Sequence, residues 1–320
     1  MKKLILVFLA VIFMSLLLPL AIICLMGGTE TSEAPSSPLP ETVSVYVTEE
    51  ERVVDMEIGG YLKCVVAAEM PADFEKEALK AQAVAARTYL YSHITEAQKG
   101  NVAESHNGAE VCTDSTHCQA YINEQKCSVN WGGSAGEKWD KISSAVDETA
   151  GEIMTYNGEI ISAVFHSTSS GATEAAVDVW GSDVPYLQSV SSVGDEYSPK
   201  YLSELTVSES EFKNSIAEKV DGTDWTKGLA DNIVRSDAGG IISLDVGGVN
   251  IKGTELRNIF SLRSTNVEIT QENGNMKMSV KGFGHGVGMS QYGANYLAEQ
   301  GEDYKHILQT YYTGVDIETR

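Results

Sequence analysis

The expected fold is decided by the stretch Val65-Val66-Ala67-Ala68-Glu69-Met70-Pro71 and its continuation in Lys80-Ala81-Gln82-Ala83 and Ala85-Ala86-Arg87-Thr88-Tyr89. Proline suits the first position of a helix, acidic residues follow it, and alanine dominates the middle of the segment. We therefore predict one long helix from Pro71 to about Lys99. Its many small side chains indicate that it packs tightly inside a domain.

Short strands and further helices surround this helix in the sequence. Alternating residues predict a strand over Val43 to Val47, and its hairpin partner is expected from Val53 to Ile58. Turn signals at Gly247-Gly248 and Asn273-Gly274 predict two more hairpins. Helices are expected behind a capping box at Ser208, behind Thr254 as a cap, from Ser290 to Gln300 and from Asp303 to Tyr312. The mixture predicts an α+β fold.

The N-terminal part has the pattern of a membrane anchor. An uncharged, mostly apolar run from Leu4 to Met26 reaches roughly 34 Å as a helix, enough for a bilayer core of about 30 Å. Two lysines precede it, so the positive-inside rule places the bulk of the chain outside the cytoplasm. A cleaved signal peptide is the alternative. We expect an anchor over 1–28, a Pro- and Ser-rich linker over 29–42 and a folded domain over 43–320.

The charge balance limits the choice of partners. The chain has 320 residues and a formal net charge of −22, from 45 acidic and 23 basic side chains. Nucleic acids bind through basic patches, so nucleic acid is excluded as a main partner. The negative net charge would repel an anionic polymer, so such a substrate would have to be bound by a few positively charged side chains close to it.

Two further stretches stand out. One is Phe165-His166-Ser167-Thr168-Ser169-Ser170-Gly171, with Thr173-Glu174 and Asp178-Val179-Trp180-Gly181 behind it. The other is Gly282-Phe283-Gly284-His285-Gly286-Val287-Gly288-Met289-Ser290-Gln291-Tyr292-Gly293-Ala294. Together with the first stretch, in this order and behind an anchor, they resemble the stage II sporulation protein D (SpoIID) family. The resemblance covers nearly everything after the linker.

The resemblance implies a function and a setting. Members of the family are lytic transglycosylases that cut peptidoglycan glycan strands during forespore engulfment, and related members are described as amidase enhancers. It also implies that Glu69 is the catalytic residue. The implied partners are glycan strands stripped of their peptides, the amidase SpoIIP and the membrane protein SpoIIM. The implied location is the cell membrane, facing the space between mother cell and forespore.

One carboxylate can suffice for this reaction. The 6-hydroxyl of N-acetylmuramic acid attacks its own anomeric carbon, so one glutamate can donate a proton to the glycosidic oxygen and then accept one from that hydroxyl. Glu69 follows an apolar run and precedes the predicted helix start; burial would raise its pKa, whereas the helix dipole would favour the anion. The alternative is that Glu69 merely caps the helix.

The three stretches also supply candidate substrate contacts around a glycan-binding cleft. Lys80 and Arg87 share a helix face and could meet the lactyl carboxylates of bare glycans. Alternating glycines let a ligand approach the main chain, or simply form a turn. For Trp180 two alternatives are open: it is a core residue, or its ring stacks against a sugar. The remaining candidates are His166, His285, Ser290, Gln291 and Tyr292.

An insertion over about 101–130 departs from the family pattern. It contains His106, Cys112, His117 and Cys118, the ligand set of a tetrahedral structural zinc site. The alternative is a disulfide of Cys112 with Cys118 or Cys127, which would leave both histidines unexplained. Four protein ligands leave no open position, so we expect such a zinc ion to hold the loop and not to perform chemistry.

Two other classes of function remain at this point. One is a non-catalytic module that binds peptidoglycan and stimulates an amidase. The other is a zinc-dependent peptidoglycan hydrolase. Product mass separates all three, because a transglycosylase leaves 1,6-anhydro ends, a hydrolase adds water and an enhancer alone releases nothing.

Overall fold

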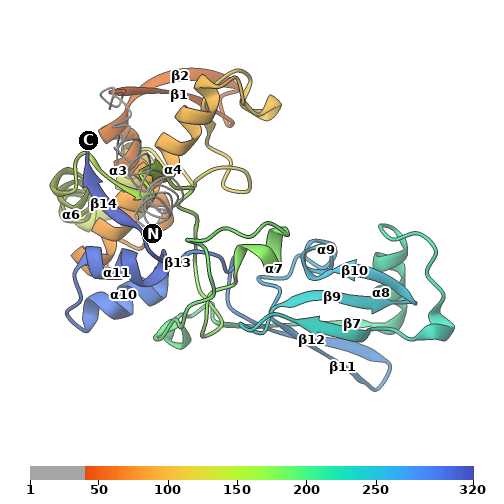
Figure 1. Cartoon of the computed structure of the whole chain (residues 1–320). Coiled ribbons are helices and arrows are strands. Elements are labelled where there is room, and N and C mark those ends of the chain that lie inside the picture. Colours follow the sequence, from red (N-terminus) through yellow and green to blue (C-terminus); the bar gives the residue numbers. More distant parts are fainter. Residues whose placement is uncertain (1–39) are drawn as a thin grey trace, which may run out of the picture. The chain divides into compact units, whose positions relative to one another are not determined.

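A computed structural model describes residues 40–320, and its mixture of helices and small sheets confirms the predicted α+β class (Figure 1). The predicted anchor and nearly all of the linker lie outside the described residues. Within residues 40–320 no helix is long and apolar enough to cross a membrane.

The helix α4 (Lys76–Gln98) is the centre of the helical part. Its middle is almost wholly buried, and the small residues Ala81, Ala83 and Ala85 let neighbouring elements approach closely, as predicted. The elements packed on α4 include α3 (Ile58–Glu69), α6 (Ala135–Glu148), α10 (Gln291–Glu299), α11 (Tyr304–Tyr311) and β4 (Glu152–Tyr156).

The predicted start of this helix at Pro71 is wrong by five residues. The segment from Pro71 to Glu75 forms a turn in which the Phe74 N–H donates to the carbonyl of Pro71 over 3.0 Å. The turn buries the Phe74 ring against Tyr292, with ring centroids 5.0 Å apart. The intrinsic helix propensity of this segment predicted a helix. The folded chain has a turn there, and the turn accompanies the burial of the Phe74 ring against a distant segment.

The helix α3 was not predicted. β2 (Arg52–Glu57) ends one residue before the expected end of the strand, and Glu57 then accepts hydrogen bonds from the N–H groups of Gly59 and Gly60 as an N-cap. Apolar residues at helical spacing are present in this part of the sequence, but the adjacent Gly59 and Gly60 made the helix difficult to recognise. The buried residues at this spacing are Ile58, Tyr61, Leu62, Val65 and Val66.

A second group of strands, β7 to β12, has its own core (Figure 1). Both predicted hairpins are confirmed here, and so is the capping box of Ser208 and Glu211. Thr254 is not the cap that the sequence suggested, because α9 already begins at Gly253. The elements are β7 (Leu202–Ser208), α8 (Glu209–Ala217), β8 (Asp231–Arg235), β9 (Ile241–Val246), β10 (Val249–Lys252), α9 (Gly253–Ile259), β11 (Val267–Glu272) and β12 (Asn275–Lys281).

The second and third sequence stretches are joined by strand pairing. β6 (Phe165–His166) runs parallel to β13 (Met289–Ser290), and isolated bridges join Thr168 to Phe283 and Glu174 to Val287. The chain thus returns from the β7–β12 region to the helical part beside the strand it left. The remaining elements are β1 (Thr42–Val47), β3 (Val111–Cys112), α5 (Glu124–Trp131), β5 (Glu159–Ile160), α7 (Ala176–Trp180) and β14 (Asp316–Thr319).

Candidate functional site

Glu69 is the last residue of α3, half-buried, with its carboxylate held by two donors. Oε1 accepts from the N–H of Ala120 over 2.7 Å and Oε2 accepts from Nε2 of Gln291 over 3.0 Å. Burial raises the pKa of Glu69, and the two donors oppose that rise. The helix-cap interpretation is wrong, because neither donor is a backbone N–H of α4 and Glu69 stands at the negative end of its own helix.

Gln291 and Tyr292 reach this site from the first turn of α10. Gln291 is buried and supplies the amide that contacts Glu69, while Tyr292 packs edge-on against Phe74. Ser290 stands at the predicted start of this helix, but it is 0% exposed and acts as the N-cap of α10, where it accepts from the N–H of Gly293. The structure therefore brings Gln291 to Glu69 and Tyr292 to Phe74 in the turn that follows Glu69.

Asp195 supports the start of α10, and no sequence motif marks it. It is 0% exposed and accepts from Ser192 Oγ, Ser290 Oγ and the N–H of Ser169 over 2.5, 2.5 and 2.8 Å. Burial raises its pKa. By holding Ser290, Asp195 fixes the helix end from which Gln291 reaches Glu69.

The glycines of the third stretch face the second stretch. Gly282, Gly284, Gly286 and Gly288 all have positive φ, as predicted for angles closed to other residues. A Cβ atom on Gly284 would lie 2.7 Å from Cβ of His166, and one on Gly288 would lie 2.1 Å from the carbonyl oxygen of Val164. The groups that come close to these glycines therefore belong to the protein chain itself.

His166 and His285 form a neutral pair beneath Trp180. The His166 and His285 ring centroids are 5.7 Å apart, and that of Trp180 is 5.4 Å from that of His285. Burial lowers the pKa of His166 to about 3 and that of His285 to about 4, so both rings are uncharged at neutral pH. Trp180 is 46% exposed, which rules out the simple core alternative.

The structure does not bring Lys80 and Arg87 to Glu69. Lys80 pairs with Glu77 of its own helix and Glu148 of α6 over 2.8 and 3.0 Å. Arg87 is 3% exposed and donates to the carbonyls of Val146 and Glu152. Burial lowers its pKa to about 10. The shared face was predicted correctly, but these contacts tie α4 to α6 and β4, and in this arrangement Arg87 cannot reach a glycan.

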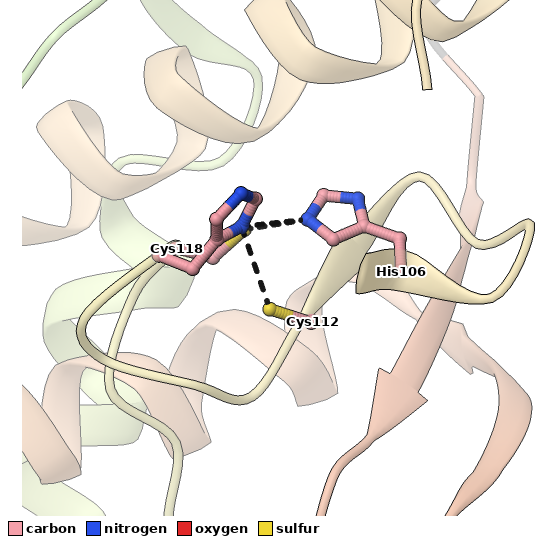
Figure 2. Close-up of side chains that lie close together, drawn as sticks. His106, Cys112 and Cys118 are labelled. Atoms are coloured by element: carbon pink, nitrogen blue, oxygen red, sulfur yellow. Dashed lines mark hydrogen bonds between the residues drawn. The ribbon is translucent and has the colours of Figure 1, made fainter. Parts of the chain in front are cut away.

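The four predicted metal ligands form one cluster (Figure 2). Nε2 of His106 lies 3.0 Å from Nδ1 of His117 and 3.3 Å from Sγ of Cys118, while Nδ1 of His117 lies 3.5 Å from Sγ of Cys118 and 3.8 Å from that of Cys112. Around a tetrahedral zinc ion, bond lengths of about 2.0 to 2.3 Å place such ligands about 3.3 to 3.8 Å apart. The residues therefore fit zinc. Cys112, Cys118 and Cys127 are free thiols in this structure.

The cluster is connected to Glu69 through the two residues that follow it in the chain. Cys118 is followed by Gln119, which is buried, and then by Ala120, whose N–H donates to Glu69. The sequence offered no reason to single out Ala120, because a backbone donor carries no side-chain signal. The insertion thus supplies part of the site.

The chain belongs to the SpoIID family. A family model described as "SpoIID: Stage II sporulation protein" matches residues 46–156. Stage II sporulation protein D of Bacillus amyloliquefaciens is 38% identical over 289 residues, which span 90% of this chain and 82% of the relative. The protein of the same name from Bacillus subtilis (strain 168) is 37% identical over 295 residues, 91% of this chain and 81% of the relative. An amidase enhancer of Bacillus subtilis (strain 168) is 29% identical over 311 residues, 80% of this chain and 40% of the relative.

Proposed function

We propose that this member of the SpoIID family is a lytic transglycosylase of peptidoglycan acting in forespore engulfment. It would cleave glycan strands between N-acetylmuramic acid and N-acetylglucosamine and leave 1,6-anhydro ends. The observation that supports this most is the carboxyl of Glu69, which is half-buried, has a raised pKa and is oriented by two donors. General acid catalysis near neutral pH needs a glutamate of this kind.

The contacts of Glu69 suit a single acid and base. In its protonated form the carboxyl gives a proton to the glycosidic oxygen as the bond from that oxygen to the anomeric carbon breaks. The N–H of Ala120 and the amide of Gln291 then stabilise the carboxylate. The carboxylate takes the proton of the 6-hydroxyl while that oxygen bonds to the anomeric carbon, which restores Glu69. Within residues 40–320 the pKa of Glu69 is shifted by burial and these two donors and by no second carboxylate.

The variant Glu69→Gln tests the proposal. Glutamine keeps the size but can neither donate nor accept the proton, so we expect anhydro product from peptide-free glycan strands to fall about a hundredfold or more. Glycan binding and folding should survive. The measurement is product mass and yield at equal concentration of folded protein.

Glu75→Gln is the matched control, because it removes an exposed carboxylate from the adjacent turn. Its yield should equal that of the wild type. Full anhydro product from Glu69→Gln would remove Glu69 from the mechanism.

The second candidate is a non-catalytic amidase enhancer, which the similarity to a protein of that name favours. In that case the wild type alone would release nothing from glycan strands. It would instead increase the release of peptides by an added amidase. The same product analysis therefore separates the two functions.

The cysteine and histidine cluster is proposed to hold a structural zinc ion. His106, Cys112, His117 and Cys118 would be its ligands, and their mutual distances suit tetrahedral coordination. All four positions would be filled by protein, so the ion would stabilise the insertion and take no part in bond cleavage. A zinc-dependent hydrolase would need an open position.

The cellular setting is proposed from the sequence. The apolar run from Leu4 to Met26 would anchor the chain, with the bulk outside the cytoplasm, between the mother cell and forespore membranes. The proposed partners are the amidase SpoIIP, which would supply peptide-free glycan, and the membrane protein SpoIIM.

A further inference from the structure

A cavity of about 260 Å³, lined by both apolar and polar side chains, lies between α7 and the strands β9 and β10. Its lining includes Asp178 from the helix, Ser243 and Asn250 from the strands, and Lys252. Glu69 and the residues that contact it are not part of this lining. The chemistry proposed above leaves the cavity without a role.

Glu174 is the buried carboxylate of this cavity. It is 5% exposed, and its Oε1 accepts from the N–H of Gly240 over 3.0 Å. Its own N–H donates to the carbonyl of Gly286 over 2.8 Å, which ties it to the glycine-rich stretch. A carboxylate has about four acceptor sites, so Glu174 keeps acceptor capacity for a ligand.

The charged groups of the lining are unpaired. Asp178 and Lys252 both line the cavity, and no ion pair within residues 40–320 includes either of them. The carboxylates, the ammonium group of Lys252 and the hydroxyls offer acceptors and donors, whereas the Nδ2 amide group of Asn250 already donates to Asp245 over 2.8 Å. Such a set suits a neutral ligand with several hydroxyl groups better than a single ion.

Trp180 is the last residue of α7, the helix that lines one side of the cavity. It immediately precedes Gly181, which lines the cavity, and its indole is 46% exposed. Packing against His285 fixes the ring at a centroid distance of 5.4 Å. An indole that is both exposed and packed in place suits a pyranose, whose C–H face packs on the ring.

We propose that this cavity and Trp180 form an accessory subsite for an N-acetylhexosamine unit of the glycan strand. The inference rests on the proposed function for its choice of ligand. His285 belongs to the glycine-rich stretch, and Gln291, six residues further on, contacts Glu69. A strand long enough to reach both places is held at the subsite while it is cut at Glu69, so long strands bind more tightly than short ones.

The test measures binding of peptide-free glycan strands, fractionated by length, to chains that carry Glu69→Gln and therefore do not cut them. Adding Trp180→Ala should lower the affinity for long strands roughly threefold to tenfold and leave the affinity for the shortest fragments nearly unchanged. Adding Asp178→Asn should act in the same direction. This second variant keeps the indole packed on His285, so it tests the subsite even if Trp180→Ala unfolds.

Tyr197→Ala is the matched control. Tyr197 is 73% exposed and stacks on Tyr296, and it does not line the cavity. Equal affinity of all three variants for long strands would overturn the subsite. The same binding measurement is repeated with peptide-bearing fragments; a loss of affinity that appears only with them would also overturn the subsite and assign the cavity to the peptide. Binding is read without cleavage, so a failure of the Glu69 chemistry leaves this result interpretable.

Discussion

At the scale of single residues, the carboxyl of Glu69 is set by opposing influences. Burial raises its pKa, whereas the donors from Ala120 and Gln291 stabilise the anion and lower it. If Glu69 acts as the acid, the rate falls as pH rises through this pKa. The alkaline limb of the pH profile therefore reports the state of Glu69.

Gln291→Ala should move that limb to higher pH. The variant removes a donor that favours the anion, so the pKa of Glu69 rises further. The maximal rate should fall as well, because the carboxyl loses one of its two orienting contacts. The measurement is kcat/KM for anhydro product against pH.

Asn295→Ala provides the comparison within the same helix. Asn295 lies on α10 and accepts from the N–H of Glu75, without touching Glu69. Its alkaline limb should coincide with that of the wild type. A shift of the Gln291→Ala limb to lower pH would contradict the assigned role of the amide.

At the scale of elements, the segment over about 101–130 links the cysteine and histidine cluster to the glutamate. Ligand loss should loosen the segment from His117 to Ala120, and hence the N–H that donates to Glu69. We expect about one zinc ion per chain in the wild type. Cys112→Ser should lose zinc, lower the melting temperature and slow the reaction. The product should still carry 1,6-anhydro ends, because a zinc ion with four protein ligands would take no part in the chemistry.

Cys127→Ser is the control for this experiment. Cys127 is a buried free thiol outside the cluster, so its variant should keep zinc. Metal analysis and thermal unfolding of both variants give the comparison. Metal-free wild type in which Cys112 and Cys118 resist alkylation until they are reduced would point to the disulfide instead.

At the scale of the whole molecule, the predicted anchor sets where the folded part works. Full-length protein should stay with membranes after alkaline or high-salt washing, because the apolar run from Leu4 to Met26 is long enough for a bilayer. Deletion of residues 1–28 should release a soluble chain with the same product. Recovery of a mature form that starts between residues 22 and 45 would show cleavage of a signal peptide.

The sequence by itself determined the features that depend on neighbouring residues. The capping box at Ser208, the hairpins around Gly247-Gly248 and Asn273-Gly274 and the tight packing of α4 follow from local caps, turns and periodicity. The cysteines and histidines of the cluster are also close together in the sequence, and this short spacing favours their proximity in the fold.

Only the tertiary structure decided the surroundings of Glu69. Its two donors are 51 and 222 residues away in the sequence, and one of them is a backbone group that no motif marks. The same holds for Arg87, whose face was predictable but whose partners, the carbonyls of Val146 and Glu152, were not. Local patterns specify which elements form, whereas the neighbours of a side chain depend on how those elements pack, and that is settled by contacts between distant segments.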